Sequence, residues 1–358
     1  MRIAQVAPLI ESVPPKLYGG TERVVSYLTE ELVRQGHAVT LFASGDSVTS
    51  ARLVAPVPTA LRLRGNCQDY LAPHTLMLEQ VLGRAEDFDI IHFHVGQMHF
   101  PLARRCLTPH VTSLHGRLDL SELDSLFEEF SDIPCVSISD AQRRPQPDAN
   151  WVGTIHHGLP PDLLTFHRGP GSYLAFLGRL SPEKRVDRAI AIARACGQRL
   201  KIAAKVDPAD ADYFARTIRP LLDDPLVDFI GEINDADKAA FLGNALALLF
   251  PIDWPEPFGL VMIEALACGT PIVAFRGGSV AEVLEHGRTG FVVNSVEEAI
   301  EAVGCIDTID RRACRASFER RFTAARMAAQ YVEIYSRIVA TGAARRAVAE
   351  PTCSTSFA

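Results

Sequence analysis

The stretch SYLAFLGRLSPEKRVDRAIAIARACGQRLKIAAKV, residues 172–206, contains one complete strand–helix–strand unit. Its apolar runs SYLAFLGRL and LKIAAKV are typical of strands, and residues 184–196 between them have the pattern of a helix that Gly197 ends. Two strands joined by a helix are typical of a parallel sheet with crossover helices. This unit therefore predicts an α/β fold.

The same alternation extends in both directions from this unit. VDFIG, ALLFPI, PIVAFR and GFVV follow it, while RIAQVAP, AVTLFA, DIIHFHV, HVTSLHG and IPCVSIS precede it. The clearest helix in the first half covers residues 22–35, with Thr21 as its candidate N-cap and Gly36 after its end. The Gly- and Pro-rich stretch at residues 158–171 interrupts the pattern and reads as a linker. The chain thus predicts two doubly wound, Rossmann-like domains in tandem.

The domain boundaries follow from that linker. We expect residues 1–165 to form an N-terminal Rossmann-like domain and residues 166–322 to form a second one. A helix at residues 323–342 should cross back to the N-terminal domain, and residues 343–358 should be a disordered tail. Because ligands of open parallel sheets bind beyond the carboxyl ends of the strands, the two domains should face a central cleft.

Composition excludes several classes of protein. The 358 residues are 47% apolar, and 36 Lys and Arg against 43 Asp and Glu give a formal net charge of -7. No basic field would hold a nucleic-acid backbone, so we expect no nucleic-acid partner. The first residues lack the long apolar segment of a signal peptide, which predicts a cytoplasmic protein. No apolar run reaches the about 18 residues of a spanning helix, so any membrane contact would be peripheral.

Two loops carry residues that suit a phosphate. Gly19 and Gly20 precede a helix and would let backbone N–H groups approach an anion, although a plain turn explains them equally well. Arg179 and Lys184 lie on the loop after SYLAFLGRL, where an Arg fork and a Lys point charge suit a diphosphate. A solvated surface is their alternative, but the carboxyl end of a strand favours a ligand site.

A third loop, DWPEPFGLVMIEALACGTP at residues 253–271, carries a pair of glutamates. The helix here should begin near Phe258 or Gly259, which leaves Glu256 on the loop and places Glu264 in the second turn. At about 100° per residue the two carboxylates lie about 80° apart around the axis, so they need not share a task. Each is suited to accept hydrogen bonds from different hydroxyl groups of one polyol ligand.

Taken together, YGGTERVV, GRLSPEK and WPEPFGLVMIEALACGTP resemble the family 4 retaining glycosyltransferases of GT-B fold, over nearly the whole chain. The family's paired glutamates match Glu256 and Glu264, and its phosphate-binding Arg and Lys match Arg179 and Lys184. Within the family, these motifs are most similar to those of the avilamycin-pathway-type subgroup, a label that names no substrate.

The resemblance implies transfer, with retention, from a nucleotide-diphospho-sugar to a hydroxyl acceptor, which can be a glycan, a lipid-linked molecule or a small molecule. Glu264 would bind the donor ribose, Glu256 the transferred sugar, and His115 in TSLHGRL would also contact that sugar. Arg179 and Lys184 would stabilise the leaving diphosphate. The other donor-binding residues would be Gly19, Gly20, Phe258, Gly259 and Leu260. The first domain would hold the acceptor and the second the donor.

The resemblance also implies that no metal or other cofactor is needed. Asp87 and Asp89 match the metal-binding DxD of the other glycosyltransferase fold, but they precede a strand instead of ending one. His92 and His94 share a face of DIIHFHV without a suitably spaced carboxylate, and we interpret them as part of a cleft wall. The eight cysteines form no CxxC pair, which favours reduced thiols.

Three departures from the family pattern stand near these motifs. Arg185 and Ala204 occupy positions where the family usually has glycine, and GGSVAE only approximates its GG-x-PE stretch, so Gly277, Gly278 and Glu282 receive no role. Two other readings of the same architecture stay open. One is a sugar phosphorylase or epimerase, and the other is a catalytically silent protein that binds a nucleotide sugar.

Overall fold

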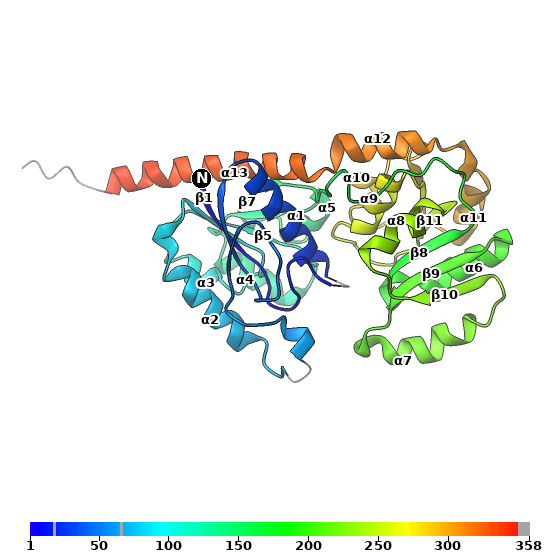
Figure 1. Cartoon of the computed structure of the whole chain (residues 1–358), viewed down its shortest axis with the longest axis horizontal. Coiled ribbons are helices and arrows are strands. Elements are labelled where there is room, and N and C mark those ends of the chain that lie inside the picture. Colours follow the sequence, from blue (N-terminus) through cyan, green and yellow to red (C-terminus); the bar gives the residue numbers. More distant parts are fainter. Residues whose placement is uncertain (17–18, 65–66, 350–358) are drawn as a thin grey trace, which may run out of the picture.

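Two parallel sheets organise the chain in the computed structural model, which describes residues 1–16, 19–64 and 67–349 (Figure 1). One sheet has seven strands in the order β3-β2-β1-β4-β5-β6-β7, and the other has six in the order β10-β9-β8-β11-β12-β13. Both orders reverse beside the first strand of the sheet, β1 or β8, as in a doubly wound fold. The prediction of two doubly wound α/β domains facing a cleft is confirmed.

The first sheet and its helices come from the first half of the chain. The strands are β1 (Arg2–Val6), β2 (Ala38–Phe42), β3 (Arg52–Val54), β4 (Ile90–Phe93), β5 (His110–Ser113), β6 (Cys135–Ser137) and β7 (Trp151–Thr154). The helices are α1 (Gly20–Arg34), α2 (Leu71–Leu82), α3 (Phe100–Ala103), α4 (Asp124–Glu129) and α5 (Asp140–Arg143).

The second sheet follows after residue 171. Its strands are β8 (Leu174–Arg179), β9 (Leu200–Lys205), β10 (Val227–Gly231), β11 (Ala247–Phe250), β12 (Ile272–Phe275) and β13 (Gly290–Val293). The helices are α6 (Val186–Cys196), α7 (Ala211–Tyr213), α8 (Asp235–Gly243), α9 (Leu260–Cys268), α10 (Val280–Val283), α11 (Val296–Gly304), α12 (Arg311–Arg321) and α13 (Ala324–Ala349).

Helices cover both faces of each sheet, and the strand sequences reflect this. Every residue of β4, β11 and β12 is buried, and these strands read as nearly continuous apolar runs instead of alternating. The polar residues among them are therefore expected to have hydrogen-bond partners inside the protein. His92 of β4 is one of these residues.

The chain passes between the two sheets twice at one place. Leu159 donates its N–H to the carbonyl of Phe322 at 2.9 Å and accepts the N–H of Ala324 at 2.8 Å. Helix α13 then lies along the first sheet, as the orange-red helix in Figure 1 shows. Its side chains Tyr331 and Tyr335 are buried there, so the last helix is part of the N-terminal core.

Some predicted boundaries are wrong. Helix α1 begins at Gly20 with Gly19 as its N-cap, so Thr21 lies inside the helix. The disordered tail predicted from residue 343 is wrong as far as Ala349, because α13 continues to that residue. The segment ATGAARRAVA is rich in Ala and Arg, which have high helix propensity. Residues 350–358 lie outside the described part of the chain.

Over residues 1–16, 19–64 and 67–349, none of the helices combines the length and apolar character that crossing a bilayer requires.

Candidate active site

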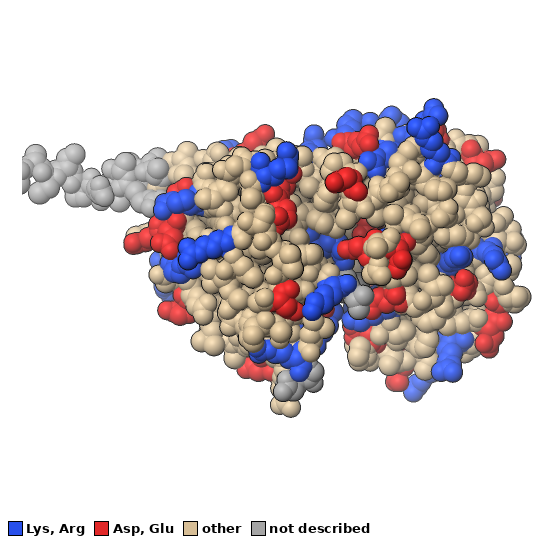
Figure 2. Space-filling view, viewed as in Figure 1, with Lys and Arg blue, Asp and Glu red and all other residues tan. Residues whose placement is uncertain are grey.

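A cavity of about 490 Å³ lies between the two sheets, and all the candidate site residues line it. Figure 2 shows the opening between the two lobes, with Lys, Arg, Asp and Glu side chains beside it. The first half contributes Gly19, Gly20 and His115, and the second half contributes Arg179, Lys184, Glu256, Phe258, Gly259, Leu260 and Glu264. The fold thus brings together residues that are more than two hundred positions apart, as is common for ligand sites in open α/β sheets.

Glu256 forms an ion pair with Lys184 inside this cavity. Its Oε2 also accepts a hydrogen bond from Trp254 Nε1 at 2.9 Å, and Glu256 is only 8% exposed. The ammonium group of Lys184 lies 5.0 Å from the centre of the Trp254 ring, a cation–π arrangement. The two charges of the pair compensate each other in a largely desolvated place.

Glu264, on the second turn of α9, pairs with a lysine that the sequence analysis missed. Its Oε1 accepts a hydrogen bond from Lys238 Nζ at 2.8 Å, and Lys238 also lies 3.2 Å from Asp235. Asp235 in turn pairs with Arg23 of α1, so this chain of charges crosses from the second half to the first. Lys238 lies on α8, outside any motif, and nothing in the sequence distinguishes it from a surface lysine.

Arg179 ends β8, and Lys184 ends the short 3-10 turn Pro182–Lys184 that follows. Arg179 Nη2 lies 2.5 Å from Glu183, and its Nε lies 3.2 Å from Asp210. Both cations of this loop therefore face carboxylates. A bound diphosphate would have to compete with those carboxylates for the two cations.

Arg185, one of the departures from the family pattern, has a physical explanation. Its backbone is left-handed, with φ 52°, a conformation that favours glycine. The guanidinium lies 2.8 Å from both Asp187 and Asp253, and these ion pairs hold the residue outside the cavity lining. The other departure, Ala204, lines the cavity.

Helix α9 points its N-terminus into the cavity. Gly259 is its N-cap in a left-handed conformation, with φ 77°, and a Cβ atom there would lie 2.8 Å from Met262 Cε and 3.4 Å from Glu256 Cγ. Glycine is therefore required for both conformation and space. The unpaired N–H groups of the first helical turn, including that of Leu260, make this end suitable for an anion or for oxygen atoms of a ligand.

His115 stands on the opposite wall, after β5. Its Nε2 lies 2.9 Å from Nδ1 of His94, and its ring stacks on that of His157 with centroids 5.3 Å apart. Burial lowers the pKa of His115 to about 4, so the ring is neutral near pH 7. Among the residues that the structure describes, Nδ1 of His115 has no hydrogen-bond partner.

The first half adds an acidic wall that the sequence analysis did not identify. Glu11 and Glu22 are buried beside the cavity, and Glu11 lies 2.9 Å from Arg62, which also lines it. Burial raises the pKa of both carboxyl groups above their usual range. Glu22 lies next to the glycine loop in the motif YGGTERVV, which was the available signal.

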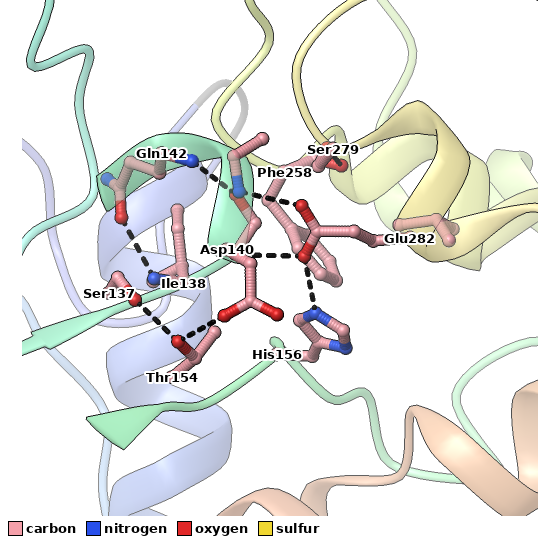
Figure 3. A network of polar contacts seen from close by, with 12 residues as sticks. Ser137, Ile138, Asp140, Gln142, Thr154, His156, Phe258, Ser279 and Glu282 are labelled. Atoms are coloured by element: carbon pink, nitrogen blue, oxygen red, sulfur yellow. Dashed lines mark hydrogen bonds and ion pairs between the residues drawn. The ribbon is translucent and has the colours of Figure 1, made fainter. Parts of the chain in front are cut away.

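Glu282, to which the sequence analysis assigned no role, connects the two halves (Figure 3). Its carboxylate accepts the N–H groups of Asp140 at 2.8 Å and Ala141 at 2.7 Å, and it lies 3.2 Å from His156 Nε2. Ser279, at the start of the same short helix, donates its hydroxyl to the carbonyl of Phe258 at 2.8 Å. One helix thus touches both the first half and the loop of Glu256.

The acidic pair near β4 lies away from this site. Asp89 pairs with Arg2 at 2.8 Å, and Asp87 pairs with Arg84 at 3.3 Å. Within residues 1–16, 19–64 and 67–349, no three His, Cys, Asp or Glu side chains gather in a way that would hold a metal ion.

Two segments of the chain match family models of glycosyltransferases. Residues 166–309 match the model for glycosyl transferases group 1, and residues 18–134 match the model for glycosyltransferase family 4. The phosphatidyl-myo-inositol mannosyltransferase of Mycobacterium leprae is 26% identical over 381 residues, which cover 96% of this chain and 98% of that protein. The D-inositol 3-phosphate glycosyltransferase 2 of Catenulispora acidiphila is 31% identical over 201 residues, 51% of this chain and 45% of that protein.

Solved structures support the fold. AviGT4, a glycosyltransferase involved in avilamycin A biosynthesis, has a TM-score of 0.73 and 25% identity, covering 95% of this chain and 98% of that one. Anabaena HepE in complex with UDP and glucose has a TM-score of 0.73 and 19% identity, covering 94% of this chain and 100% of that one. The chain has the GT-B fold that the resemblance of its motifs predicts.

Proposed function

We propose that this chain, whose two halves match glycosyltransferase family models, is a retaining glycosyltransferase that uses a nucleotide-diphospho-sugar and needs no metal. The sugar would pass to a hydroxyl group of a glycan, a lipid-linked molecule or a small molecule. AviGT4 covers nearly the whole chain, and this similarity supports the avilamycin-pathway-type subgroup. The first half would hold the acceptor and the second half the donor.

The main support for this proposal is that one cavity is lined both by cationic or N–H donor groups and by carboxylate acceptors. Arg179, Lys184 and the N-terminus of α9 supply positive charge and N–H donors. Glu256 and Glu264 supply acceptors for hydroxyl groups. A nucleotide-diphospho-sugar needs both, because it has an anionic diphosphate between two polyols.

Three of the predicted donor contacts involve side chains that already have partners of opposite charge in the structure. Lys184 is held by Glu256 and Arg179 by Glu183, so a diphosphate would replace these carboxylates as the partner of the cations. Glu264, freed from part of its pairing with Lys238, would accept hydrogen bonds from the ribose. Anabaena HepE, which shares the fold, is described in complex with UDP, and this supports a donor sugar that is attached to a nucleoside diphosphate.

The chemistry would rest mainly on electrostatic stabilisation. As the bond from the sugar to the phosphate breaks, negative charge grows on the diphosphate, where Arg179, Lys184 and the glycine loop of Gly19 and Gly20 would stabilise it. Positive charge develops on the sugar, near the carboxylate of Glu256. In this proposal the leaving phosphate accepts the proton of the acceptor hydroxyl, on the same face of the sugar.

The acceptor would contact the acidic wall of Glu11 and Glu22. Two buried carboxyl groups beside Arg62 suit the hydroxyl groups of a polyol. Relatives of this chain are named as transferases acting on phosphatidyl-myo-inositol and on inositol 3-phosphate, and this supports an acceptor rich in hydroxyl groups.

A thermal-shift screen with UDP, GDP and ADP sugars tests the donor. A ligand at a hundred times its dissociation constant stabilises the folded state by about 2.7 kcal/mol, which shifts the melting temperature measurably. Glu264→Gln should reduce the shift, while Glu298→Gln, on an exposed helix end, serves as the matched control. No shift with any sugar nucleotide would contradict the proposal. Release of nucleoside diphosphate on addition of acceptor, without inorganic phosphate, separates transfer from phosphorolysis.

A further inference from the structure

A buried chain of hydrogen bonds starts at His115 and ends on helix α13. All the members after His115 are buried at the carboxyl edge of the first sheet or on α13. In order they are His115, His94, Gln5, Tyr335, His92, Ser113 and Tyr331, with neighbouring atoms 2.6–3.1 Å apart. The chain therefore connects the cavity wall to a helix more than two hundred residues away in sequence.

The amide of Gln5 determines which atoms donate and which accept hydrogen bonds between Gln5 and the cavity. Its Oε1 only accepts hydrogen bonds, so Nε2 of His94, 2.7 Å away, carries a proton. Burial lowers the pKa of His94 well below its usual range, and the ring is neutral, which leaves its Nδ1 as an acceptor. Nε2 of His115, 2.9 Å away, must then carry a proton. A neutral His115 keeps a lone pair on Nδ1.

The other half of the chain is compatible with this orientation of Gln5. The amide Nε2 of Gln5 donates to the hydroxyl of Tyr335 at 3.1 Å. That hydroxyl then donates to Nδ1 of His92 at 2.6 Å, and Nε2 of His92 donates to Ser113 at 2.8 Å. Turning the Gln5 amide around would require every later proton in the chain to reverse.

We propose that Gln5 is a positioning residue that sets the tautomer of His115, so that the ring offers its Nδ1 lone pair to a hydroxyl group of the transferred sugar. Nδ1 of His115 is buried and has no hydrogen-bond partner among the described residues, and the residue as a whole lines the cavity. The sugar as the ligand rests on the proposed function, whereas the tautomer does not. The site would thus select sugars with a hydroxyl group at the position facing His115.

The tautomer can be measured in the unliganded, full-length protein. In protein labelled with ¹⁵N-histidine, the shifts distinguish a protonated from an unprotonated ring nitrogen, and loss of signals in His115→Ala assigns the residue. The parent should show His115 protonated on Nε2 alone. Protonation on Nδ1, or a mixture of the two tautomers, would overturn the proposal.

Three variants test the origin of the tautomer. Gln5→Met keeps the size of the side chain but removes both hydrogen bonds, and His115 should then populate both tautomers. Gln5→Glu keeps an acceptor oxygen for His94 and should restore the single tautomer. Ser113→Ala removes a bond from the far end of the same chain and should leave His115 unchanged. A single unchanged tautomer in Gln5→Met, or failure of Gln5→Glu to restore it, would show that packing decides it. If Gln5→Met fails to fold, protonation of His115 on Nδ1 in the parent or in Gln5→Glu would still overturn the proposal.

Calorimetry separates this inference from the proposed function. Gln5→Met should weaken binding of the sugar nucleotide by about twofold if the two tautomers become equally populated, because only the tautomer with a free Nδ1 accepts the hydroxyl group, and should leave binding of the nucleoside diphosphate unchanged. If no sugar nucleotide binds the parent while the tautomer is as expected, the proposed function fails and the role of Gln5 in setting the tautomer stands. Equal weakening of both ligands would mean that Gln5→Met disturbs the site generally, and would contradict the contact to sugar.

Discussion

The carboxylate of Glu282 accepts the backbone N–H of Asp140 at 2.8 Å, although the two residues flank different sheets. It also accepts the N–H of Ala141 at 2.7 Å, and Ser279 on the same helix donates its N–H to the carbonyl of Glu256 at 3.0 Å. The contact therefore ties the first half of the chain to the loop that carries a candidate catalytic glutamate (Figure 3).

Replacing this carboxylate should destabilise the protein in a pH-dependent way. Burial opposes ionisation of Glu282, but hydrogen bonds from His156, Asp140 and Ala141 outweigh it and lower the pKa of the carboxyl group. Because the folded pKa is lower than the unfolded one, the contribution is present above about pH 4.3 and is lost as pH falls through the folded value. Urea unfolding at pH 7 should show a loss of about 1–3 kcal/mol in Glu282→Gln.

Glu298→Gln is the control for this measurement, because Glu298 is exposed and its carboxylate accepts hydrogen bonds from Asn294 of its own segment. Its loss should be smaller than that of Glu282→Gln. Identical stability of Glu282→Gln and the parent at pH 7 would show that the contact between the halves contributes nothing.

The two cavity glutamates should have separable effects. Contacts of Glu264 with ribose would exist in the ground state and the transition state alike, so Glu264→Gln should raise KM and weaken nucleoside diphosphate binding. Glu256 would act where charge develops, so Glu256→Gln should lower kcat by about a hundredfold, or about 3 kcal/mol, with nucleoside diphosphate binding nearly unchanged. Calorimetric titration with UDP, GDP and ADP compares the variants. Equal weakening in both would refute this division of roles.

Activity should survive removal of metal ions. Arg179, Lys184 and the N-terminus of α9 already supply positive charge to the cavity where a metal would otherwise neutralise the diphosphate. Transfer rates measured with and without excess EDTA should therefore be equal. Loss of activity in EDTA with recovery on adding Mn²⁺ or Mg²⁺ would count against the mechanism.

Gly259→Ala should damage the donor site and not only the fold. An alanine would adopt the left-handed conformation at a cost of about 1–2 kcal/mol, and its Cβ would lie 3.1 Å from Phe250 Cζ and 3.4 Å from Glu256 Cγ. Gly287→Ala is the matched control, since Gly287 has φ 74° with no atom within 4 Å of an added Cβ. Both variants should melt earlier, but only Gly259→Ala should weaken donor binding. Equal donor affinities would contradict this expectation.

The buried histidines should make the fold sensitive to mild acid. Burial lowers the pKa of His92, His94, His99, His115 and His157 in the folded state. In the unfolded chain such groups titrate near pH 6.5, so below that pH the unfolded state binds more protons and stability falls. Urea unfolding between pH 7.5 and 5 should show a slope steeper than the about 1.4 kcal/mol per pH unit of a single proton.

His99→Asn tests the source of that slope. His99 lies outside the candidate site, with its Nε2 2.7 Å from Thr112 Oγ1. Its replacement should reduce the slope by about 1.4 kcal/mol per pH unit, the value of one proton. A stability of the parent that does not change with pH would contradict buried neutral histidines as its source of acid sensitivity.

The local pattern of apolar residues, glycines and prolines in the sequence was enough to predict the sheet architecture and the positions of the loops. The alternation around residues 172–206 predicts parallel strands and crossover helices because buried strands and amphipathic helices leave different apolar periods in the sequence. Gly197 and Gly259 correspond to left-handed helix ends, which glycine adopts most easily. Since ligands bind at carboxyl ends of parallel strands, the same pattern also located Arg179 and Glu256.

The partners of these residues required the folded chain. Lys238 beside Glu264, Glu282 beside Asp140, and Gln5 between His94 and Tyr335 all join residues from different elements. By itself, the sequence determined which residue types stand at the strand ends, because periodicity and turn chemistry act over a few neighbouring residues. Only the tertiary structure decided which charges pair and which side chains lie within hydrogen-bonding distance of His115, because electrostatic pairing and hydrogen bonding depend on distances of a few ångströms between segments far apart in the chain.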